Sequence, residues 1–236
     1  MRKGLVLLVM GLLATAASAD VIATDPAGDG FGIGIMDLLQ LDANTVGTDL
    51  ALTLTINGDV NATNWGKYLV FIDTGPGGGA SQFPNSDPPT NDANPWVRNI
   101  AIGTSHLADY FIGSWVDSGG GSQFWQFTGV GSPQWSTSAG AGLVINPGAI
   151  STLQYTVPLA SLGVGPGSTI YLEAVSTGGG SYDSAIDTVN APSNDWNAVN
   201  WQDQASIMNS SPYTITPEPA SLALLVLGGL ALIRRR

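Results

Sequence analysis

The chain has no cysteine and very few basic residues, and both absences narrow its chemistry. Without thiols it can form neither disulfides nor zinc–thiolate sites. Of the 7 basic residues, only Lys67 and Arg98 lie in residues 20–216, which hold 17 of the 18 acidic residues. The net charge of that segment is therefore −15. A surface of this sign repels phosphate backbones, so we expect no nucleic-acid partner.

Helix-forming residues are scarce as well. Glu173 is the one glutamate in residues 20–216, and the chain holds 31 glycines and 14 prolines. This composition disfavours helices and favours turns and short strands. Residues 20–216 are long enough to bury one all-β core without disulfides.

Short apolar segments between the turn residues predict strands. Residues 49–57 alternate strictly, so their even-numbered aliphatic side chains should face a core: Leu50, Leu52, Leu54 and Ile56. Residues 67–73 form an apolar run typical of a central strand. Further strands are expected at residues 96–102, 110–115, 123–128, 143–146, 153–157, 169–176 and 184–188. We therefore predict an antiparallel, jelly-roll-like β-sandwich over residues 20–192, followed by a spacer over 193–216.

Three segments do not fit the strand pattern. Residues 158–163 predict a short helix closed by a glycine, whereas residues 36–41 fit either a strand or one helical turn. Residues 75–94 form a long loop rich in glycine and proline. Loops of this length are either functional or solvated excursions, and the sequence leaves both open.

The N-terminus has the three parts of a secretory signal peptide. Two basic residues precede an apolar run at residues 5–13, and the small residues Ala17 and Ala19 stand just before Asp20. We expect signal peptidase to remove residues 1–19. The alternative is that these residues form a structural N-terminal helix.

The C-terminus has a second three-part pattern. The triplet Pro217-Glu218-Pro219 is followed by an uncharged apolar run at residues 220–233 and then by Arg234, Arg235 and Arg236. A helix over this run would be ~21 Å long at 1.5 Å per residue. A hydrocarbon core is ~30 Å thick, so the run predicts a marginal transmembrane helix with its arginines on the cytoplasmic side.

This C-terminal pattern resembles the PEP-CTERM sorting signal of Gram-negative bacteria. The resemblance implies an exosortase-type membrane enzyme as partner, a transient membrane anchor, and delivery to the cell surface or the extracellular space. It also implies an association with exopolysaccharide and biofilm. The alternative is an ordinary C-terminal membrane anchor.

Aspartates near the start of the predicted domain are candidate metal ligands. Asp25 and Asp29 flank a Pro-Ala-Gly turn, and Asp37 follows a short distance along the chain. Carboxylates on a glycine-containing loop can converge on Ca²⁺, which takes 6–8 oxygen ligands. We predict a structural calcium ion here and no other cofactor. The alternative is an Asx turn that only starts the first strand.

Seven tryptophans are a second candidate feature, because indole faces pack against the C–H faces of sugars. Trp135, Trp196 and Trp201 lie in polar segments and are the predicted sugar-binding residues. Capping of the sandwich ends is the alternative. Trp65 and Trp115 lie beside or within predicted strands and are expected in the core.

The sequence contains no convincing catalytic motif. His106, the only histidine, has Ser105 and Asp109 as sequence neighbours, but triad members normally come from separate elements. A glycosidase would need two opposed carboxylates, and 16 aspartates allow too many pairings to indicate one. We therefore expect a protein that is not an enzyme, and keep a small hydrolase only as a contrast.

The body also resembles the C-terminal β-sandwich module of glucodextranase and related amylolytic enzymes, which is similar to carbohydrate-binding and DOMON-type sandwiches. The matching motifs follow in order: DPAGDGFG at 25–32, YLVFIDT at 68–74, NPW at 94–96, DYFIGSW at 109–115 and IDT at 186–188. The resemblance covers residues 25–192 and implies no catalysis. The predicted function is thus a non-catalytic surface or matrix protein, or alternatively a carbohydrate-binding module stabilised by calcium.

Overall fold

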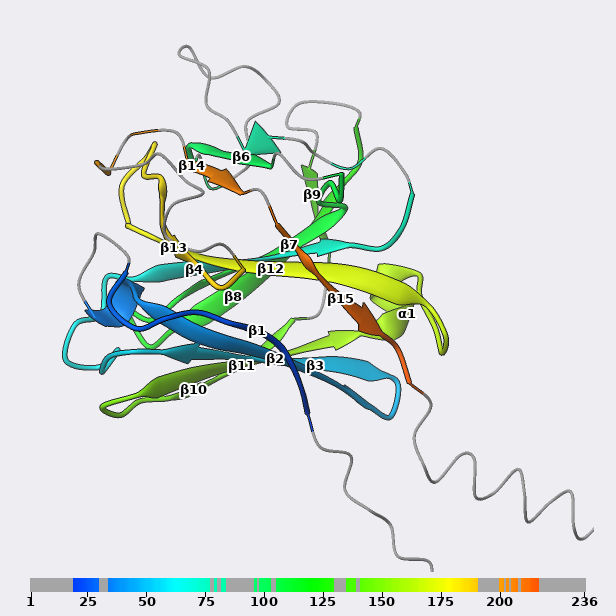
Figure 1. The fold of residues 1–236 in the computed structure, drawn as a ribbon, viewed down its shortest axis with the longest axis horizontal. Helices are drawn as coiled ribbons and strands as arrows, with labels where there is room; N and C mark the ends of the chain where they lie inside the picture. Colours follow the sequence, from blue (N-terminus) through cyan, green and yellow to red (C-terminus); the bar gives the residue numbers. More distant parts are fainter. Residues whose placement is uncertain are drawn as a thin grey trace, which may run out of the picture.

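The computed structural model describes residues 19–29, 34–76, 79, 82–83, 96, 98–102, 105–129, 135–138, 141–190, 200–201, 203, 205–207 and 209–216. Most of these residues lie in antiparallel sheets stacked in layers (Figure 1). The predicted all-β sandwich is therefore confirmed.

Two large sheets form the sandwich. The first has five strands in the order β1 (Asp20–Thr24), β2 (Leu38–Val46), β3 (Asp49–Ile56), β11 (Ser151–Pro158) and β10 (Gly142–Asn146). The second has seven: β13 (Ala185–Thr188), β12 (Thr169–Thr177), β4 (Lys67–Asp73), β7 (Tyr110–Trp115), β8 (Gly121–Phe127) and β9 (Trp135–Ser138), with β15 (Ser211–Thr214) also paired to β12.

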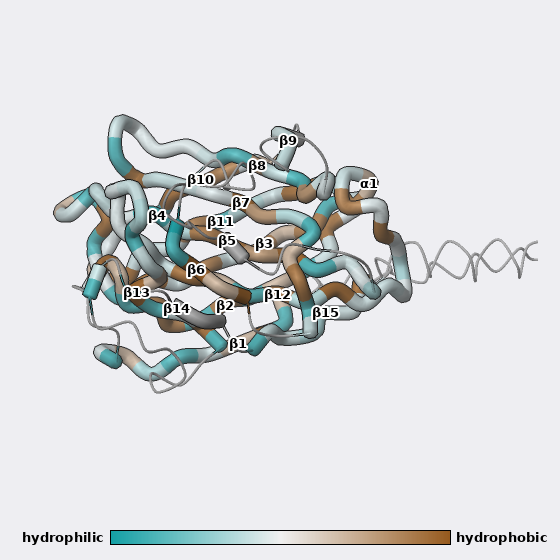
Figure 2. The backbone as a smooth tube through the Cα atoms, turned by 90° about the horizontal axis from the view of Figure 1, so that it is seen from above, coloured by the Kyte–Doolittle hydropathy of each residue, from teal (hydrophilic) through white to brown (hydrophobic). Residues whose placement is uncertain are grey.

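A small third sheet lies over the outer face of the seven-stranded sheet (Figure 1). Its middle strand β6 (Ile100–Ile102) pairs with β14 (Ala205–Ile207) in parallel and with β5 (Gln82–Phe83) in antiparallel fashion. Figure 2 shows hydrophobic residues along β6, within the outline of the larger sheets. The seven-stranded sheet therefore has apolar side chains on both faces.

The main core lies between the two large sheets and confirms the alternation predicted for β3. All four predicted inward side chains of that strand are buried: Leu50, Leu52, Leu54 and Ile56. A second core lies on the outer face of the seven-stranded sheet and includes Leu69, Phe71, Phe111 and Trp135. Because β4 supplies residues to both cores, it reads as a continuous apolar run and not as an alternating one.

Buried tyrosine hydroxyls connect the layers. The hydroxyls of Tyr155 and Ser114 lie 2.8 Å apart, which joins β11 to β7 across the main core. Tyr68 donates from β4 to the carbonyl of Ile35 over 2.7 Å. A buried hydroxyl without a partner would be costly, so these bonds favour one alignment of the two sheets.

Several predicted elements are found with small shifts. Strands 67–73 and 110–115 have the predicted bounds, but 96–102 shrinks to 100–102. Residues 36–41 contain both alternatives, because the 3₁₀ helix η1 (Gly34–Met36) ends just before β2. The helix expected at 158–163 is α1 (Leu159–Leu162), closed by Gly163 at φ 67°.

The spacer predicted at residues 193–216 is wrong for its C-terminal part. Strand β15 pairs with β12 over four residues, and the side chains of Tyr213 and Ile215 are buried in the main core. Polar residues around this strand hid it, although Tyr213 and Ile215 alternate with Pro212 and Thr214. The sandwich therefore includes residues up to at least 215.

The two predicted targeting segments lie largely outside the described residues. Ala17 and the rest of the signal peptide up to residue 18 are among these, as are the Pro-Glu-Pro triplet and the apolar run after it. Within the described part of the chain, no helix has the length and apolar character needed to cross a membrane.

The new domain boundary predicts the effect of a substitution. Replacing Ile215 by Ala should lower the free energy of unfolding by about 2–5 kcal/mol, because a buried side chain is deleted from the core. Thr216→Ala, at an exposed neighbour, should stay within about 0.5 kcal/mol. Urea denaturation of both variants measures this, and equal stabilities would restore the spacer interpretation.

Candidate metal centre

Four aspartates meet where the N-terminal segments of the five-stranded sheet lie beside β13 of the seven-stranded sheet. They are Asp25, Asp29, Asp37 and Asp187. One carboxylate oxygen of each lies within 4.8 Å of those of the other three. We refer to this group as the four-aspartate cluster.

Three separate segments supply the cluster. Asp25 follows the last residue of β1, and Asp29 comes after the turn that leaves this strand. The turn contains Gly28 at φ 85°, a backbone conformation that glycine adopts without strain. Asp37 lies between η1 and β2, and Asp187 lies in β13. The cluster therefore joins the two sheets at one corner of the sandwich.

Hydrogen bonds fix two of the carboxylates. Asp37 Oδ2 accepts from the backbone N–H of Gly28 over 2.8 Å and from the side-chain amide of Asn57 over 2.7 Å. Asp187 Oδ2 accepts from the backbone N–H of Leu38 over 2.6 Å. The last bond links β13 directly to β2, across the two layers. These donors orient the carboxylates before any ion is bound.

Other oxygens of the cluster have no such partner. Asp25 Oδ2, Asp29 Oδ1 and Asp37 Oδ1 are buried and accept no hydrogen bond from any described residue. Asp25 is only 9% exposed, Asp37 7% and Asp187 3%. Buried oxygens without a donor are costly, and they are the atoms that a cation would bind. The cluster therefore has both the donors and the burial of a metal site.

The negative charges of the cluster repel each other at neutral pH. Burial, followed by the charges of Asp187 and Asp29, raises the pKa of Asp25 to about 8. Burial also raises the pKa of Asp187 to about 7, with the charges of Asp29 and Asp37 acting in the same direction. Several carboxylates this close cannot all ionise without a counter-charge. A divalent cation would supply that charge and displace the protons.

The donor atoms select the class of ion. All four side chains offer only oxygen, which suits hard cations and not Zn²⁺ or Cu²⁺. Ca²⁺ accepts 6–8 oxygens in a flexible geometry, whereas Mg²⁺ requires near-ideal octahedral geometry and keeps several waters. Four carboxylates from three segments, three of them with a buried oxygen that accepts no hydrogen bond from a described residue, match Ca²⁺ better.

The sequence anticipated most of this cluster. The structure brings Asp25, Asp29 and Asp37 together as predicted, although an ion at this position stays a prediction. Asp187 was missed, because it lies 150 residues beyond Asp37 and in a strand, with no local ligand pattern around it. In the sequence, the motif Ile186-Asp187-Thr188 supports only the resemblance to the glucodextranase module. An aspartate in a buried strand was the available signal.

The predicted sugar-binding tryptophans are separated by the structure. Trp135 is wrong as an exposed platform, because it is 4% exposed and packs edge-on against Phe111 in the second core. Trp196 lies outside the described residues. Trp201 is exposed, and its ring centroid lies 5.4 Å from that of Trp65, a residue expected in the core.

The single histidine contacts a buried aspartate and a tyrosine. His106 Nδ1 lies 2.8 Å from Asp73 Oδ2, and its ring stacks on Tyr171 at a centroid distance of 3.4 Å. Asp73 is buried, so it holds the imidazole in one orientation. Asp109, the aspartate considered as a triad member, instead accepts from the N–H and the hydroxyl of Thr74.

Comparison with known proteins gives no match that bears on this site. No protein-family model matches the chain, and no curated protein matches it significantly. The resemblances to PEP-CTERM proteins and to the glucodextranase module therefore stay predictions from the sequence.

Removal of one cluster carboxylate should remove most of the stabilisation by calcium. At a calcium concentration 100 times the dissociation constant, binding adds about 2.7 kcal/mol to the native state. For a chain of this size that corresponds to roughly 5–10 °C in Tm. Asp187→Asn should remove most of this shift, because it deletes a charged ligand. Calorimetry with calcium and with EDTA measures it.

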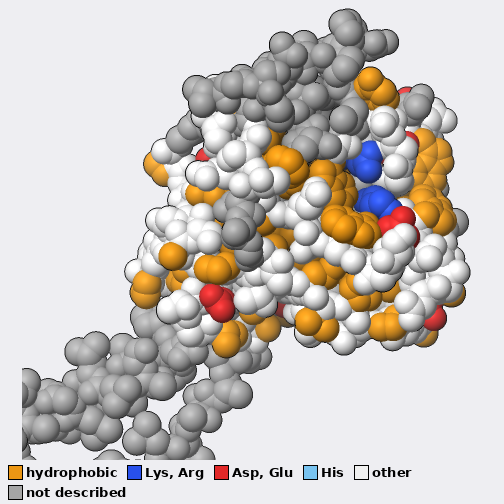
Figure 3. Space-filling model, turned by 180° about the vertical axis from the view of Figure 1, so that it is seen from behind, with side chains coloured by type: hydrophobic (Ala, Val, Ile, Leu, Met, Phe, Trp, Pro, Cys, Tyr) orange, Lys and Arg blue, Asp and Glu red, His pale blue; other side chains and the backbone are white. Residues whose placement is uncertain are grey.

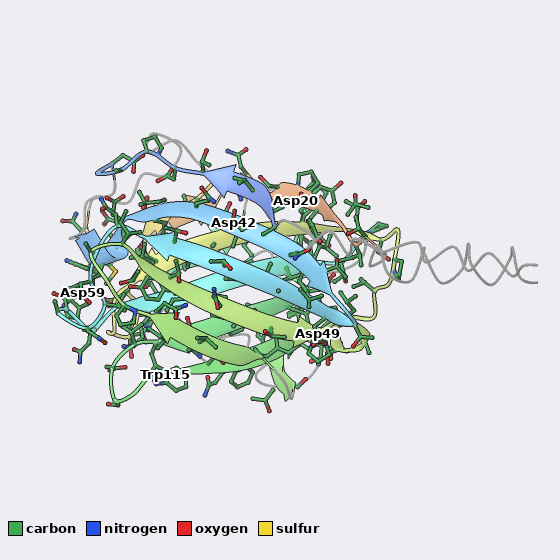
Figure 4. All side chains as sticks on the ribbon, turned by 90° about the horizontal axis from the view of Figure 1, so that it is seen from below. Asp20, Asp42, Asp49, Asp59 and Trp115 are labelled. Carbon is green, nitrogen blue, oxygen red and sulfur yellow. The ribbon has the colours of Figure 1, made fainter. Side chains whose placement is uncertain are left out.

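The matched control for that experiment is Asp42→Asn. Asp42 lies on β2, as Leu38 does, but on the outer face of the five-stranded sheet, where Gln40 contacts it (Figure 4). Its variant should keep the full calcium shift. A wild-type Tm that calcium leaves unchanged would contradict the metal assignment.

The raised pKa values predict that the stability of the protein depends on pH, and that stabilisation by calcium depends on pH in the opposite direction. Because Asp25 and Asp187 hold protons more tightly when folded than when unfolded, the apo protein should lose stability as the pH rises from about 4 to 8. Calcium competes with these protons, so the Tm difference between calcium and EDTA should grow over the same range. Thermal melts at pH 5, 6, 7 and 8 test this, and a constant difference would contradict it.

Proposed function

We propose that the chain is an exported, non-catalytic surface or matrix protein whose β-sandwich is locked by one calcium ion. The observation that carries the proposal is the convergence of four buried or partly buried aspartates from both sheets, with three buried oxygens that accept no hydrogen bond within the described residues. An ion at this corner would fasten β1, β2 and β13 to each other. Its role is to hold the layers together and not to perform a reaction.

The proposed location fits the chemistry of this site. Extracellular calcium-binding modules commonly have dissociation constants of about 10⁻⁴–10⁻³ M, which suits an ion that is abundant outside cells and scarce inside. An apo protein with repelling buried carboxylates would be less stable in a calcium-poor compartment. Calcium-dependent stability therefore accords with a protein that works after export.

The terminal segments supply the rest of the proposal. Strand β1 begins at Asp20, so cleavage after Ala19 would leave the first strand whole. At the other end, Ile215 is the last buried residue described, two positions before Pro217. We propose that residues 217–236 tether the sandwich through a short transmembrane helix until an exosortase acts on the Pro-Glu-Pro triplet.

Mass spectrometry of the exported protein tests both parts at once. We expect an intact mass that starts at Asp20 and, under native conditions, one calcium ion per chain. The C-terminal mass would show whether the tail after Pro217 has been removed. A full-length chain recovered from the cytoplasm, with residues 1–19 still present, would contradict export. A native mass without calcium would contradict the site alone.

A further inference from the structure

Four tryptophans lie near the end of the seven-stranded sheet at which β4 begins and β7 ends. They are Trp65, Trp96, Trp115 and Trp201. The ring centroids of Trp65 and Trp201 are 5.4 Å apart, and those of Trp96 and Trp115 are 6.1 Å apart. We refer to these four side chains as the indole face. Figure 4 places Trp115 at the rim of the sandwich.

Contacts through two cations connect the two pairs. Lys67 donates to the carbonyl of Trp65 over 3.2 Å, and its backbone is directly opposite Trp115 in the sheet. Arg98 lies 5.8 Å from the ring centroid of Trp96 and donates to the carbonyl of Gly180.

The contact of Arg98 with Gly180 connects Trp96 to the pair formed by Trp65 and Trp201. Gly180 belongs to the glycine turn at residues 178–180, and Trp201 packs against Gly178 in the same turn. Figure 3 shows the two basic side chains of this face beside hydrophobic ones, with an acidic side chain adjoining the lower of them. These contacts place the two tryptophan pairs beside each other at the same end of the sheet.

Glycines let two of these rings lie against the sheet. A Cβ atom on Gly113 would be 2.6 Å from the ring of Trp96, and one on Gly121 would be 2.2 Å from the ring of Trp115. Any larger residue would push the indoles away from the strands. The rings of Trp96 and Trp115 therefore pack directly against the backbone of the sheet at these glycines.

The indole face is also accessible and polar at its edges. Trp65 is 38% exposed and Trp201 is 37% exposed. Trp96 Nε1 donates to Gln123 Oε1 over 2.7 Å, which fixes the orientation of that ring. The adjacent turn holds Tyr182 at φ 71°, a conformation that persists in a bulky residue only where its surroundings impose it. A partly exposed aromatic surface with polar atoms at its edge suits an amphipathic ligand.

Charge decides which ligand fits. Lys67 is paired with Asp117 at 3.3 Å, and Arg98 is 5% exposed and feels the charge of Asp183. Neither cation therefore offers a free positive charge to an incoming anion. The net charge of −15 on residues 20–216 repels polyanions as well.

We propose that the indole face binds a neutral polysaccharide. Pyranose rings present an apolar C–H face to the indoles and hydroxyl groups to the polar atoms at the edge, such as the amide of Gln123. This activity goes beyond the calcium-locked scaffold, because the indole face shares no residue with the four-aspartate cluster.

Affinity electrophoresis of the full-length chain, saturated with calcium, tests the proposal. Laminarin, dextran and xyloglucan in the gel are the neutral probes, and alginate is the anionic one. We expect retardation by at least one neutral glucan and none by alginate. Trp65→Ala and Trp201→Ala should each weaken that binding about tenfold or more, and Trp65→Phe should restore part of it.

Val144→Ala is the matched control, because Val144 is an exposed hydrophobic residue on β10 of the opposite sheet. It should bind as the wild type does. Absence of binding to all three neutral glucans would overturn the proposal, as would equal binding by the wild type and both tryptophan variants. Stronger retardation by alginate than by the glucans would overturn the choice of a neutral ligand. Melting curves of each variant in calcium show that the fold and the metal site are retained.

Discussion

Repulsion among buried carboxylates is the constraint around which this sandwich is arranged. The two large sheets are held face to face by an apolar core, but their corner at β1, β2 and β13 brings four aspartates within 4.8 Å. Hydrogen bonds from Gly28, Leu38 and Asn57 offset only part of the cost. The proposed cation would offset this repulsion and crosslink the two sheets at the same corner.

The sequence predicted those elements whose signal is local. Alternation in residues 49–57 and the apolar runs at 67–73 and 110–115 gave strands with nearly correct bounds, because the pleat imposes a period of two and burial on both faces removes it. Strand β15 escaped, since a four-residue strand containing a proline carries little pattern of its own. Its place is decided by pairing with β12, which no local window contains.

The residues of the candidate sites also divide into those with a local sequence signal and those without one. Asp25, Asp29 and Asp37 are close in sequence and could be proposed together, whereas Asp187 joins them only through the register of β13 against β12. For the tryptophans, a polar neighbourhood in sequence was a poor guide to exposure. Trp135 is buried by the third sheet's layer, and Trp65 is exposed because the chain has not yet entered β4. The sequence shows where the tryptophans are, but the packing of the sheets determines which of their side chains are exposed.

The distance along the chain between the members of the four-aspartate cluster would matter for the proposed export. Leu38 and Asp187 are 149 residues apart, yet one hydrogen bond and the cluster join them. A polypeptide threaded through a translocon with its N-terminus leading would release Asp25 long before Asp187. The corner would therefore stay open during transit, and calcium could close it only once most of the chain had emerged. Binding of the ion would then be the last step in the folding of the exported protein.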